Sequence, residues 1–305
     1  MSFEIITFEE GEKYLDWIKL CDAFEAGHKL PKAEIGDTFL YRDPDTLLSR
    51  AAWINGMGLA VKSATVFPDN PASGKPMING SVSVFSDDDG ALEAVIDFHL
   101  VTKWKTAGDS VFAARKLARP DSRKVLIVGA GTVGRSLFHA YSATFPDAEF
   151  SVWNRTVANA ELMASEHSGL KVVTNLEEAV SAADIVTSAT MSTEPLIKGD
   201  WLRAGQHIDL IGAYRPDMRE VDDEALLRAK VFVDSFDTTV GHIGEIKIPL
   251  ESGIISREGL RADYYQPQKF KRENDDEITL FKNGGGAHLD LMTSRYIIEA
   301  WRASK

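Results

Sequence analysis

The sequence has little that would direct the chain into an oxidising compartment or a membrane. Cys21 is its single cysteine, so one chain cannot form an internal disulfide, and we interpret this thiol as inert rather than catalytic. The first residues, Met1–Glu4, have neither the basic nor the apolar segment of a signal peptide. No uninterrupted apolar stretch approaches the ~18 residues that a membrane span requires. We therefore expect a soluble, cytoplasmic protein.

Basic side chains are outnumbered as well. The 34 Lys and Arg residues face 46 Asp and Glu residues, which gives a formal net charge of −12. Such a surface repels nucleic acid and anionic membranes, so we expect neither as a partner. This surface average leaves room for one locally basic pocket. The 305 residues suffice for two domains of ordinary size.

Metal-binding patterns are missing too. The seven histidines show no ligand spacing such as H-E-x-x-H. The acidic run Asp87–Asp89 is followed by Gly90 and is typical of a hairpin tip. We therefore predict no metal site.

The first third of the chain changes from helical to strand patterns. Residues 7–28 carry apolar side chains at helical spacing, which favours one or two helices. Between about 36 and 100, short β-rich runs alternate with turn clusters and predict a mostly antiparallel sheet with a covering helix. A long helix is expected over 99–118, ended by Pro120.

From residue 124 onward, strands and helices alternate. The expected strands are 124–128, 149–153, 171–173, 185–188, 207–211 and 231–234, with helices at 159–167 and 176–182 between them. Such alternation is typical of a doubly wound α/β domain of the Rossmann type. A last helix over 289–303 is expected to pack on the first domain.

A glycine-rich turn follows the first of these strands. Residues 129–134 read Gly-Ala-Gly-Thr-Val-Gly and open a predicted helix, as a dinucleotide-binding turn requires. Gly129 permits the tight turn, Gly131 lets the backbone approach a pyrophosphate, and Gly134 lets helix and strand pack closely. The amides at the helix start, including those of Thr132 and Val133, can hold the anion. The sequence therefore predicts a dinucleotide cofactor.

The residues after the next strand indicate which dinucleotide is bound. An NAD site usually has Asp or Glu there, which bonds the ribose 2′-hydroxyl. Here the segment is Trp153-Asn154-Arg155-Thr156, without a carboxylate. Arg155 can meet the 2′-phosphate of NADP, and Asn154 and Thr156 can add neutral hydrogen bonds. We expect NADP(H) in preference to NAD(H), predict Thr190 as a further cofactor contact, and keep a surface arginine without a ligand as the alternative.

Several further motifs occur in a fixed order. They are Val61–Lys62, Thr65–Pro68, Gly74–Pro76, Val128–Gly131, Thr193–Pro195, Gly212, Arg215–Glu220, Val233–Ser235, Thr279–Lys282 and Asp290. With them the chain resembles the ornithine cyclodeaminase/μ-crystallin family from about Leu48 to Asp290, and within it the Δ1-pyrroline-2-carboxylate (ketimine) reductases.

This resemblance implies an α/β fold with two domains. A Rossmann domain over 119–279 would bind the nucleotide. A smaller α+β domain, built from 1–118 and 280–305, would bind substrate and form a homodimer. Members act on amino acids, imino acids or keto acids beside a nicotinamide, so a small anionic imino or amino acid is the expected substrate.

Three cations are candidates for contacting that substrate. Lys62 matches the family's substrate lysine, and Arg50 lies at nearly the spacing of a substrate-facing position. Lys105 matches a position where many members carry a carboxylate-binding arginine, so the cation is kept and the bidentate fork is lost. The plainer alternatives are a solvated strand end for Lys62, an ion pair for Arg50, and pairing of Lys105 with Asp109 at i+4.

Tyr214 separates two activities within the resemblance. Cyclodeaminases have an aspartate at this position, which works as the acid and base in ammonia release. A phenol is too weak an acid to replace a carboxylate near neutral pH. Cyclodeaminases also commonly carry an acidic residue after the second strand and use NAD. The departures at Tyr214 and Asn154 therefore favour an imine reductase.

The expected function is thus NAD(P)H-dependent reduction of a cyclic imino acid. The candidate substrates are Δ1-pyrroline-2-carboxylate and Δ1-piperideine-2-carboxylate, which give L-proline and L-pipecolate. Arg50 and Lys105 would anchor the carboxylate, and Lys62 would be a third anchor or the catalytic proton source. The alternatives are an ornithine cyclodeaminase, which converts ornithine to proline and ammonia, an amino-acid dehydrogenase, or a non-catalytic NADPH-dependent binding protein like μ-crystallin.

Overall fold

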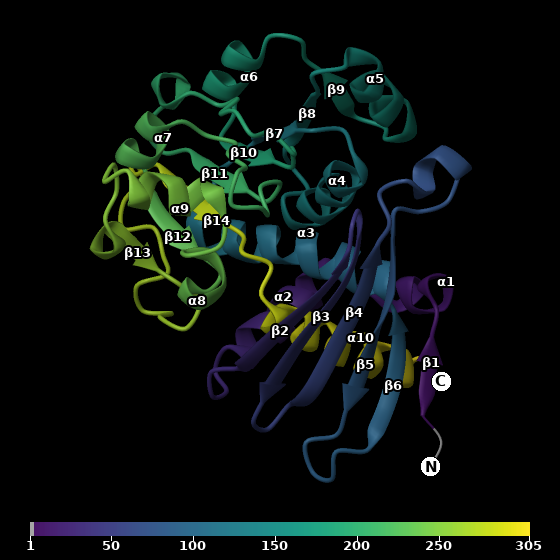
Figure 1. The fold of residues 1–305 in the computed structure, drawn as a ribbon. Coiled ribbons are helices and arrows are strands. Elements are labelled where there is room, and N and C mark those ends of the chain that lie inside the picture. Colours follow the sequence, from purple (N-terminus) through teal and green to yellow (C-terminus); the bar gives the residue numbers. More distant parts are fainter. Residues whose placement is uncertain (1–2) are drawn as a thin grey trace. The chain divides into compact units, whose positions relative to one another are not determined.

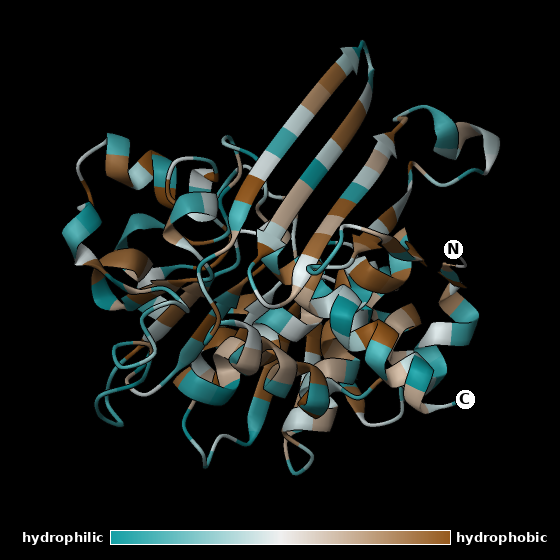
Figure 2. Ribbon diagram, turned by 90° about the horizontal axis from the view of Figure 1, so that it is seen from below, coloured by the Kyte–Doolittle hydropathy of each residue, from teal (hydrophilic) through white to brown (hydrophobic). Residues whose placement is uncertain are grey.

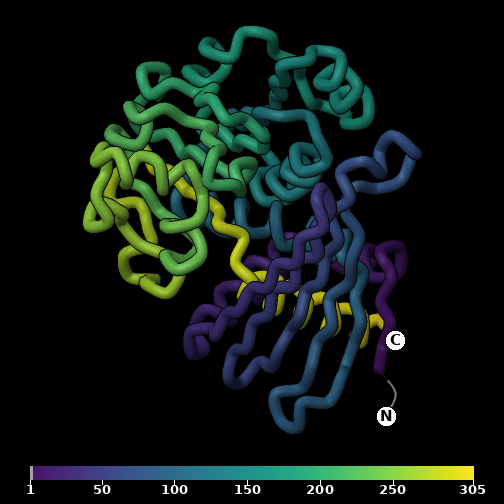
Figure 3. Tube along the Cα trace, viewed as in Figure 1, coloured from purple at the N-terminus to yellow at the C-terminus, as the bar shows by residue number. Residues whose placement is uncertain are grey.

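The computed structural model describes residues 3–305, which form two compact units. Unit 1 contains the chain up to Lys105 together with Gly286–Lys305, and unit 2 contains Thr106–Gly285. The chain leaves unit 1 within one long helix and returns to it near the C-terminus, so both ends belong to unit 1 (Figure 3).

Unit 1 is built on a six-stranded sheet with the order β1-β6-β5-β4-β3-β2. Its elements are β1 (Glu4–Ile6), α1 (Phe8–Gly11), the 3₁₀ helix η1 (Glu12–Tyr14), α2 (Trp17–Gly27), β2 (Glu34–Arg42), β3 (Asp45–Ile54), β4 (Gly58–Val66), η2 (Asn70–Ser73), β5 (Ile78–Phe85), β6 (Leu92–Asp97), the first part of α3 (Phe98–Leu117) and α10 (Ala287–Ala303). Strands β2 to β6 are antiparallel, and β1 runs parallel to β6. The predicted antiparallel sheet is confirmed.

Helix α10 covers one face of this sheet. It contacts β3, β4 and β5 as well as α2 (Figure 1). Its buried residues include Leu289, Leu291 and Ile298. The prediction that the last helix packs back on the first domain is therefore confirmed, and any polar group on the covered face of the sheet must find its partner there.

Acidic caps fix where two helices of unit 1 begin. Asp16 precedes α2 and accepts hydrogen bonds from two amides of its first turn, each at 2.9 Å. Asp97 does the same for α3, with amide distances of 2.7 and 3.0 Å. Such caps satisfy donors that have no partner within the helix. Helix α3 then ends at Leu117, close to the end predicted from Pro120.

Unit 2 is built on an eight-stranded sheet with the order β13-β12-β14-β11-β10-β7-β8-β9, and every pair in it is parallel. Its further elements are β7 (Lys124–Val128), α4 (Thr132–Thr144), β8 (Glu149–Trp153), α5 (Val157–Glu166), β9 (Leu170–Val172), α6 (Leu176–Ala182), β10 (Ile185–Ser188), η3 (Gly199–Trp201), β11 (His207–Leu210), α7 (Asp223–Arg228), β12 (Lys230–Val233), α8 (Phe236–Thr239), α9 (Gly244–Glu251), η4 (Arg257–Gly259), β13 (Leu260–Ala262) and β14 (Thr279–Lys282). The Rossmann-type fold class is confirmed.

The strand order places a ligand-binding point in unit 2. The chain adds β8 and β9 on one side of β7 and then crosses to β10 on the other side. Strands β7 and β10 therefore flank the position where the order reverses. In open α/β sheets, ligands bind beyond the carboxyl ends of the strands at this switch point.

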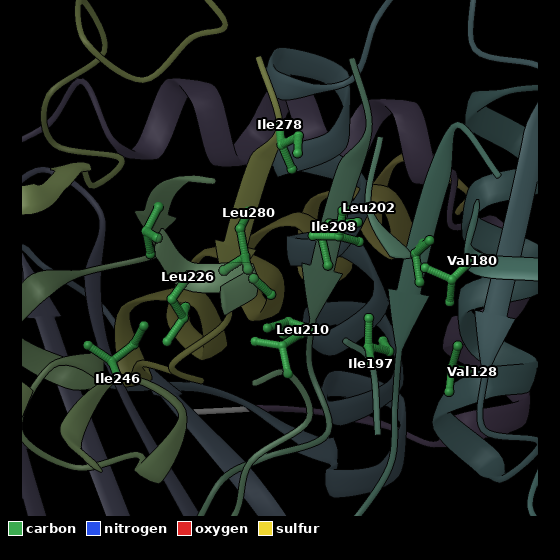
Figure 4. Close-up of a cluster of buried hydrophobic side chains, with 14 of the residues drawn as sticks. Val128, Val180, Ile197, Leu202, Ile208, Leu210, Leu226, Ile246, Ile278 and Leu280 are labelled. Atoms are coloured by element: carbon green, nitrogen blue, oxygen red, sulfur yellow. The ribbon is translucent and has the colours of Figure 1, made fainter. Parts of the chain in front are cut away.

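Strand β14 was not predicted as a strand of this sheet, yet it lies near its middle. It pairs with β11 on one side and β12 on the other. Leu280 is completely buried in the apolar cluster of this sheet, together with Val128, Ile208 and Leu210 (Figure 4). The expected domain boundary after residue 279 therefore moves to 285, because β14 is paired on both edges.

The other boundary moves for a similar reason. The first domain was expected to extend to 118, but the second half of α3 belongs to unit 2. There Asp109 accepts a hydrogen bond from the Tyr264 hydroxyl at 2.6 Å, and the Leu117 carbonyl accepts one from Arg272 Nε at 2.8 Å. The Asp109 carboxylate considered as a partner for Lys105 thus binds Tyr264 and Asn283.

One buried carboxylate joins the loops that follow β10 and β11. Glu220 Oε1 accepts hydrogen bonds from the Ser188 hydroxyl at 2.6 Å and from the amide and hydroxyl of Thr190 at 2.8 and 2.9 Å. Its Oε2 accepts from the amides of Gly212 and Ala213 at 2.7 and 3.1 Å. Five donors stabilise a charge that would otherwise be costly to bury. Glu220 therefore holds two loops at the carboxyl edge of the sheet.

A second carboxylate supports the first. Glu245 on α9 accepts hydrogen bonds from the amides of Glu220 and Val221, at 2.7 and 3.2 Å. Burial and the negative charge of Glu220 raise the pKa of Glu245 to about 7, while Lys282 acts in the opposite direction. In the folded protein Glu245 therefore keeps its proton up to about pH 7.

This raised pKa predicts a pH-dependent stability. Below its ordinary pKa of 4.5, Glu245 is protonated in both the folded and the unfolded chain. Between pH 4.5 and about 7 only the folded chain keeps this proton, so the free energy of unfolding falls as pH rises. In Glu245→Gln the free energy of unfolding in urea should fall by about 1–3 kcal/mol less between pH 5 and pH 8 than in wild type. The control Glu251→Gln on the same helix should keep the wild-type slope. A wild-type slope in Glu245→Gln would contradict the prediction.

Candidate functional site

Lys62 lies on the buried face of the unit 1 sheet. Residues along β4 alternate between its two faces, so Lys62 shares a face with the buried Ala60 and Ala64. Arg50 on β3 is directly opposite Lys62 and therefore projects from the same face. Only 9% of Lys62 is exposed. The alternative of a solvated strand end is wrong, since the strand continues to Val66.

The ammonium of Lys62 has two partners. Its Nζ donates a hydrogen bond to Asp290 Oδ1 at 3.0 Å, and it lies 4.7 Å from the centre of the Phe98 ring. Asp290 is in the first turn of α10, where the helix dipole favours a negative charge. In the sequence, Asp290 stood out only as a motif position. The signal in the sequence was a carboxylate placed between Leu289 and Leu291.

Three cations act on this one carboxylate. Burial raises the pKa of Asp290, but Lys62, Lys105 and Arg50 together outweigh it and hold that pKa below its usual value. Burial lowers the pKa of Lys62, and the charges of Lys105 and Arg50 lower it further, while Asp290 opposes them. Lys105 on α3 is itself 6% exposed. The structure thus brings the three predicted cations of unit 1 into one electrostatic group, which favours an anion.

Arg50 also forms an ion pair, as the alternative to a substrate contact predicted, and its partner is Asp37. Its Nη2 lies 2.9 Å from Asp37 Oδ2, and its Nε is 3.1 Å from both oxygens of that carboxylate. Asp37 and Arg50 are directly paired across β2 and β3, and both are partly exposed. The planar guanidinium presents its five donors in a fixed fork, the geometry that matches a carboxylate.

His288 is a further buried group near these cations. Burial and the charge of Lys105 lower its pKa to about 3, although Asp290 acts in the opposite direction. Its ring packs edge-on against His28, with 5.4 Å between centroids. His288 is therefore a neutral imidazole near neutral pH. The spacing of the histidines indicates only that they lack a metal-ligand pattern, so His288 was not predicted as a residue of this site.

The predicted glycine turn in unit 2 has the expected conformation. Gly129 has φ of +111°, which a residue with a side chain rarely adopts. A Cβ at Gly134 would overlap the carbonyl oxygen of Gly129, so this position packs against the turn itself. The amide of Gly129 donates to the Trp153 carbonyl at 2.8 Å, which ties the turn to the end of β8.

The start of α4 has room for an anion. Gly131 precedes the helix and supplies no side-chain cap, and Thr132 and Val133 are its first residues. A Cβ added at Gly131 would meet no other atom within 4 Å. Open space, uncapped amides and the switch point between β7 and β10 together fit the pyrophosphate of a dinucleotide.

The residues predicted to read the ribose lie after β8. Arg155 and Thr156 are exposed, and Thr156 precedes α5. Asn154 instead braces the turn: its Oδ1 accepts from the amide of Ala130 at 3.0 Å, and its Nδ2 donates to the Thr156 carbonyl at 2.9 Å. Thr190 follows β10 and is held by Glu220. No carboxylate lies between 153 and 156.

Within residues 3–305, no group of three or more His, Cys, Asp or Glu side chains is arranged to hold a metal ion. No helix in that range combines the length and apolar character needed to cross a membrane.

Comparison with known proteins gives consistent relatives. Residues 52–305 match the model of the ornithine cyclodeaminase/mu-crystallin family. The chain is 48% identical to a Δ1-pyrroline-2-carboxylate reductase of Paracoccus denitrificans over 302 residues, which cover 96% of both proteins. It is 32% identical to the ketimine reductase mu-crystallin of Mus musculus, over 81% of this chain and 77% of the relative.

Solved structures agree over the full chain. The Δ1-pyrroline-2-carboxylate reductase of Thermococcus litoralis, in complex with NADH and L-proline, superposes with a TM-score of 0.90 at 28% identity and covers 99% of this chain and 98% of its own. An archaeal alanine dehydrogenase dimer with bound NAD also has a TM-score of 0.90 at 28% identity, covering 100% and 97%.

Proposed function

Because this chain belongs to the ornithine cyclodeaminase/mu-crystallin family, we propose that it is an NAD(P)H-dependent reductase of a cyclic imino acid. The substrates would be Δ1-pyrroline-2-carboxylate, Δ1-piperideine-2-carboxylate or both, and the products L-proline and L-pipecolate. The observation that carries the proposal is the buried Lys62, which shares a sheet face with Arg50 and feels the charge of Lys105 on α3. Similarity to reductases so named supports it.

The three cations suit the two charged ends of such a substrate. Arg50 and Lys105 would anchor its carboxylate by charge-assisted hydrogen bonds. Lys62, with its lowered pKa, is a better proton donor than an ordinary lysine and would protonate the imine nitrogen or hold the carboxylate as a third anchor. A bound nicotinamide supplies the hydride that adds to the imine carbon. One hydride and one proton then convert C=N to CH–NH.

Tyr214 argues against the cyclodeaminase alternative. It occupies the place of the aspartate expected there, and 61% of it is exposed. The amino-acid dehydrogenase and the non-catalytic binding protein are two further alternatives, and an assay of the reaction distinguishes them. A dehydrogenase would need free ammonia in the reductive direction, and a binding protein would retain the ligand without turnover.

Activity can be measured as oxidation of NADPH or NADH with each cyclic imine. We expect turnover without added ammonia, and Lys62→Met should lower kcat/KM by about 10²–10⁴-fold, because it loses a proton donor or anchor. The exposed Lys29→Met on α2's C-terminal side should behave as wild type. Absence of oxidation with both imines would refute the proposed activity.

For the cofactor, we propose NADP(H) in preference to NAD(H). The support is the exposed Arg155 and the lack of a carboxylate after β8. The two solved relatives described above contain NADH and NAD, so both reduced cofactors belong in the assay. Because residues 153–156 contain no acidic side chain that would repel a 2′-phosphate, this segment can accept either cofactor.

Arg155→Gln tests that preference directly. Loss of a charge-assisted contact of about 1.5–3 kcal/mol should lower kcat/KM for NADPH by about 10–100-fold. The value for NADH should change less than about twofold, because NADH has no 2′-phosphate. Arg257→Gln, an exposed arginine elsewhere in unit 2, serves as the control. An equal loss with both cofactors would remove Arg155 as the selective group.

We also propose that the protein is a homodimer formed through unit 1. The edge strand β2 is almost entirely exposed, and Phe39, Leu40 and Tyr41 are 48%, 60% and 75% exposed. Apolar and polar bands alternate along the β2–β3 hairpin (Figure 2). Open edges with apolar side chains favour association, and a second copy is the occupant consistent with the dimer of the archaeal relative.

Sedimentation equilibrium checks the dimer. The double variant Leu40→Asp/Tyr41→Asp should halve the measured mass. Each subunit would have to bury two uncompensated charges in the interface, which disfavours the dimer. Leu162→Asp on α5, a comparably exposed apolar residue of unit 2, should leave the mass unchanged. A wild-type monomer, or a dimer that survives the double variant, would exclude this surface.

A further inference from the structure

We propose that Asp290 is a positioning residue that fixes the ammonium of Lys62 and keeps it charged for the reaction. This inference rests on the proposed function and adds a residue to its machinery. The hydrogen bond from Lys62 Nζ to Asp290 Oδ1, at 3.0 Å, joins the middle of β4 to the first turn of α10. Asp290 would act through Lys62 rather than by touching substrate.

The pair is hard to explain as a stabilising element. Lys62 and Asp290 are 9% and 2% exposed, so both charges have lost most of their hydration. A buried ion pair seldom stabilises a fold more than apolar residues of similar volume would. The neighbouring Ala60 and Ala64 show that this face of β4 otherwise takes small apolar side chains. We therefore infer that this charged pair serves the reaction rather than the stability of the fold.

The geometry leaves the ammonium with capacity for a ligand. Lysine has three N–H donors, and Asp290 Oδ1 takes one. On the other side, Asp290 Oδ2 is buried without a hydrogen-bond partner among residues 3–305. The Lys62 ammonium can therefore remain attached to Asp290 while its other protons face a substrate. Removal of Asp290 would free the side chain to turn.

Asp290 also opposes every other influence on the charge of Lys62. Arg50 on β3 and Lys105 on α3 both repel the ammonium, and burial disfavours it further. His288, two residues before Asp290 on α10, is neutral because its pKa is about 3. From the other neighbouring strand, β5, the residue opposite is the apolar Val82. Asp290 is the carboxylate that offsets these cations.

The variant Asp290→Asn keeps the shape and removes the charge. Loss of an opposite charge at this distance should move the alkaline limb of kcat/KM to lower pH by about 1–3 units. The ratio of kcat/KM at pH 9 to kcat/KM at pH 6 should be more than about tenfold lower in Asp290→Asn than in wild type. Asp290→Glu, which restores a carboxylate, should return the limb toward its wild-type position.

A matched control uses another ion pair to the same helix. Glu93 on β6 binds Arg295 of α10, with both carboxylate oxygens 2.9 Å from Nη1, so Glu93→Gln breaks another ion pair between sheet and helix. Its alkaline limb should not move. Circular dichroism and melting temperature show whether each variant is folded. An unmoved limb in folded Asp290→Asn, or the same shift in Glu93→Gln, would overturn the proposal.

A second measurement needs no turnover. Trace labelling with acetic anhydride, followed by mass spectrometry of the Lys62 peptide, reports the fraction of neutral amine at each pH. The midpoint for Lys62 should fall by about 1–3 units in Asp290→Asn and stay unchanged in Glu93→Gln. A shift in labelling without imine reduction would refute the proposed function alone. Reduction with unshifted labelling would refute the role of Asp290 alone.

Discussion

The ion pair between Lys62 and Asp290 is the interaction on which the candidate substrate site depends. Alternation along β4 forces Lys62 onto a buried face, and α10 must then bring an opposite charge to that face. The C-terminal helix thus does more than cover apolar surface. It completes a charged group whose other members, Arg50 and Lys105, come from β3 and α3.

In unit 2 a buried carboxylate holds backbone amides in place, as Asp290 holds the Lys62 side chain in unit 1. The Glu220 carboxylate gathers the loops after β10 and β11, beside the switch point where a dinucleotide would bind. Asn154 gives similar support to the glycine turn after β7. Conformationally free glycine loops are therefore held by fixed polar contacts, which is how a site can be prepared before its ligand arrives.

Local patterns made several features of the chain predictable. The continuous apolar run of β7 and the spacing of Gly129, Gly131 and Gly134 identify a strand, a turn and a helix within a few residues of one another. Strand β14 was missed because it is short and finds its partners, β11 and β12, far away in the sequence. The predicted end of the first domain at residue 118 differs from the observed boundary after Lys105, because one continuous helix pattern runs across that boundary.

The sequence by itself determined the fold class, the glycine turn, the family and the identity of the three cations, because these features depend on residue type and short spacing. Tertiary structure decided their chemistry. Only the folded chain shows that Lys62 is buried, that Asp290 is its partner, and that Asn154 braces the turn. Burial and charge proximity arise from segments distant in sequence, so no local pattern can specify them.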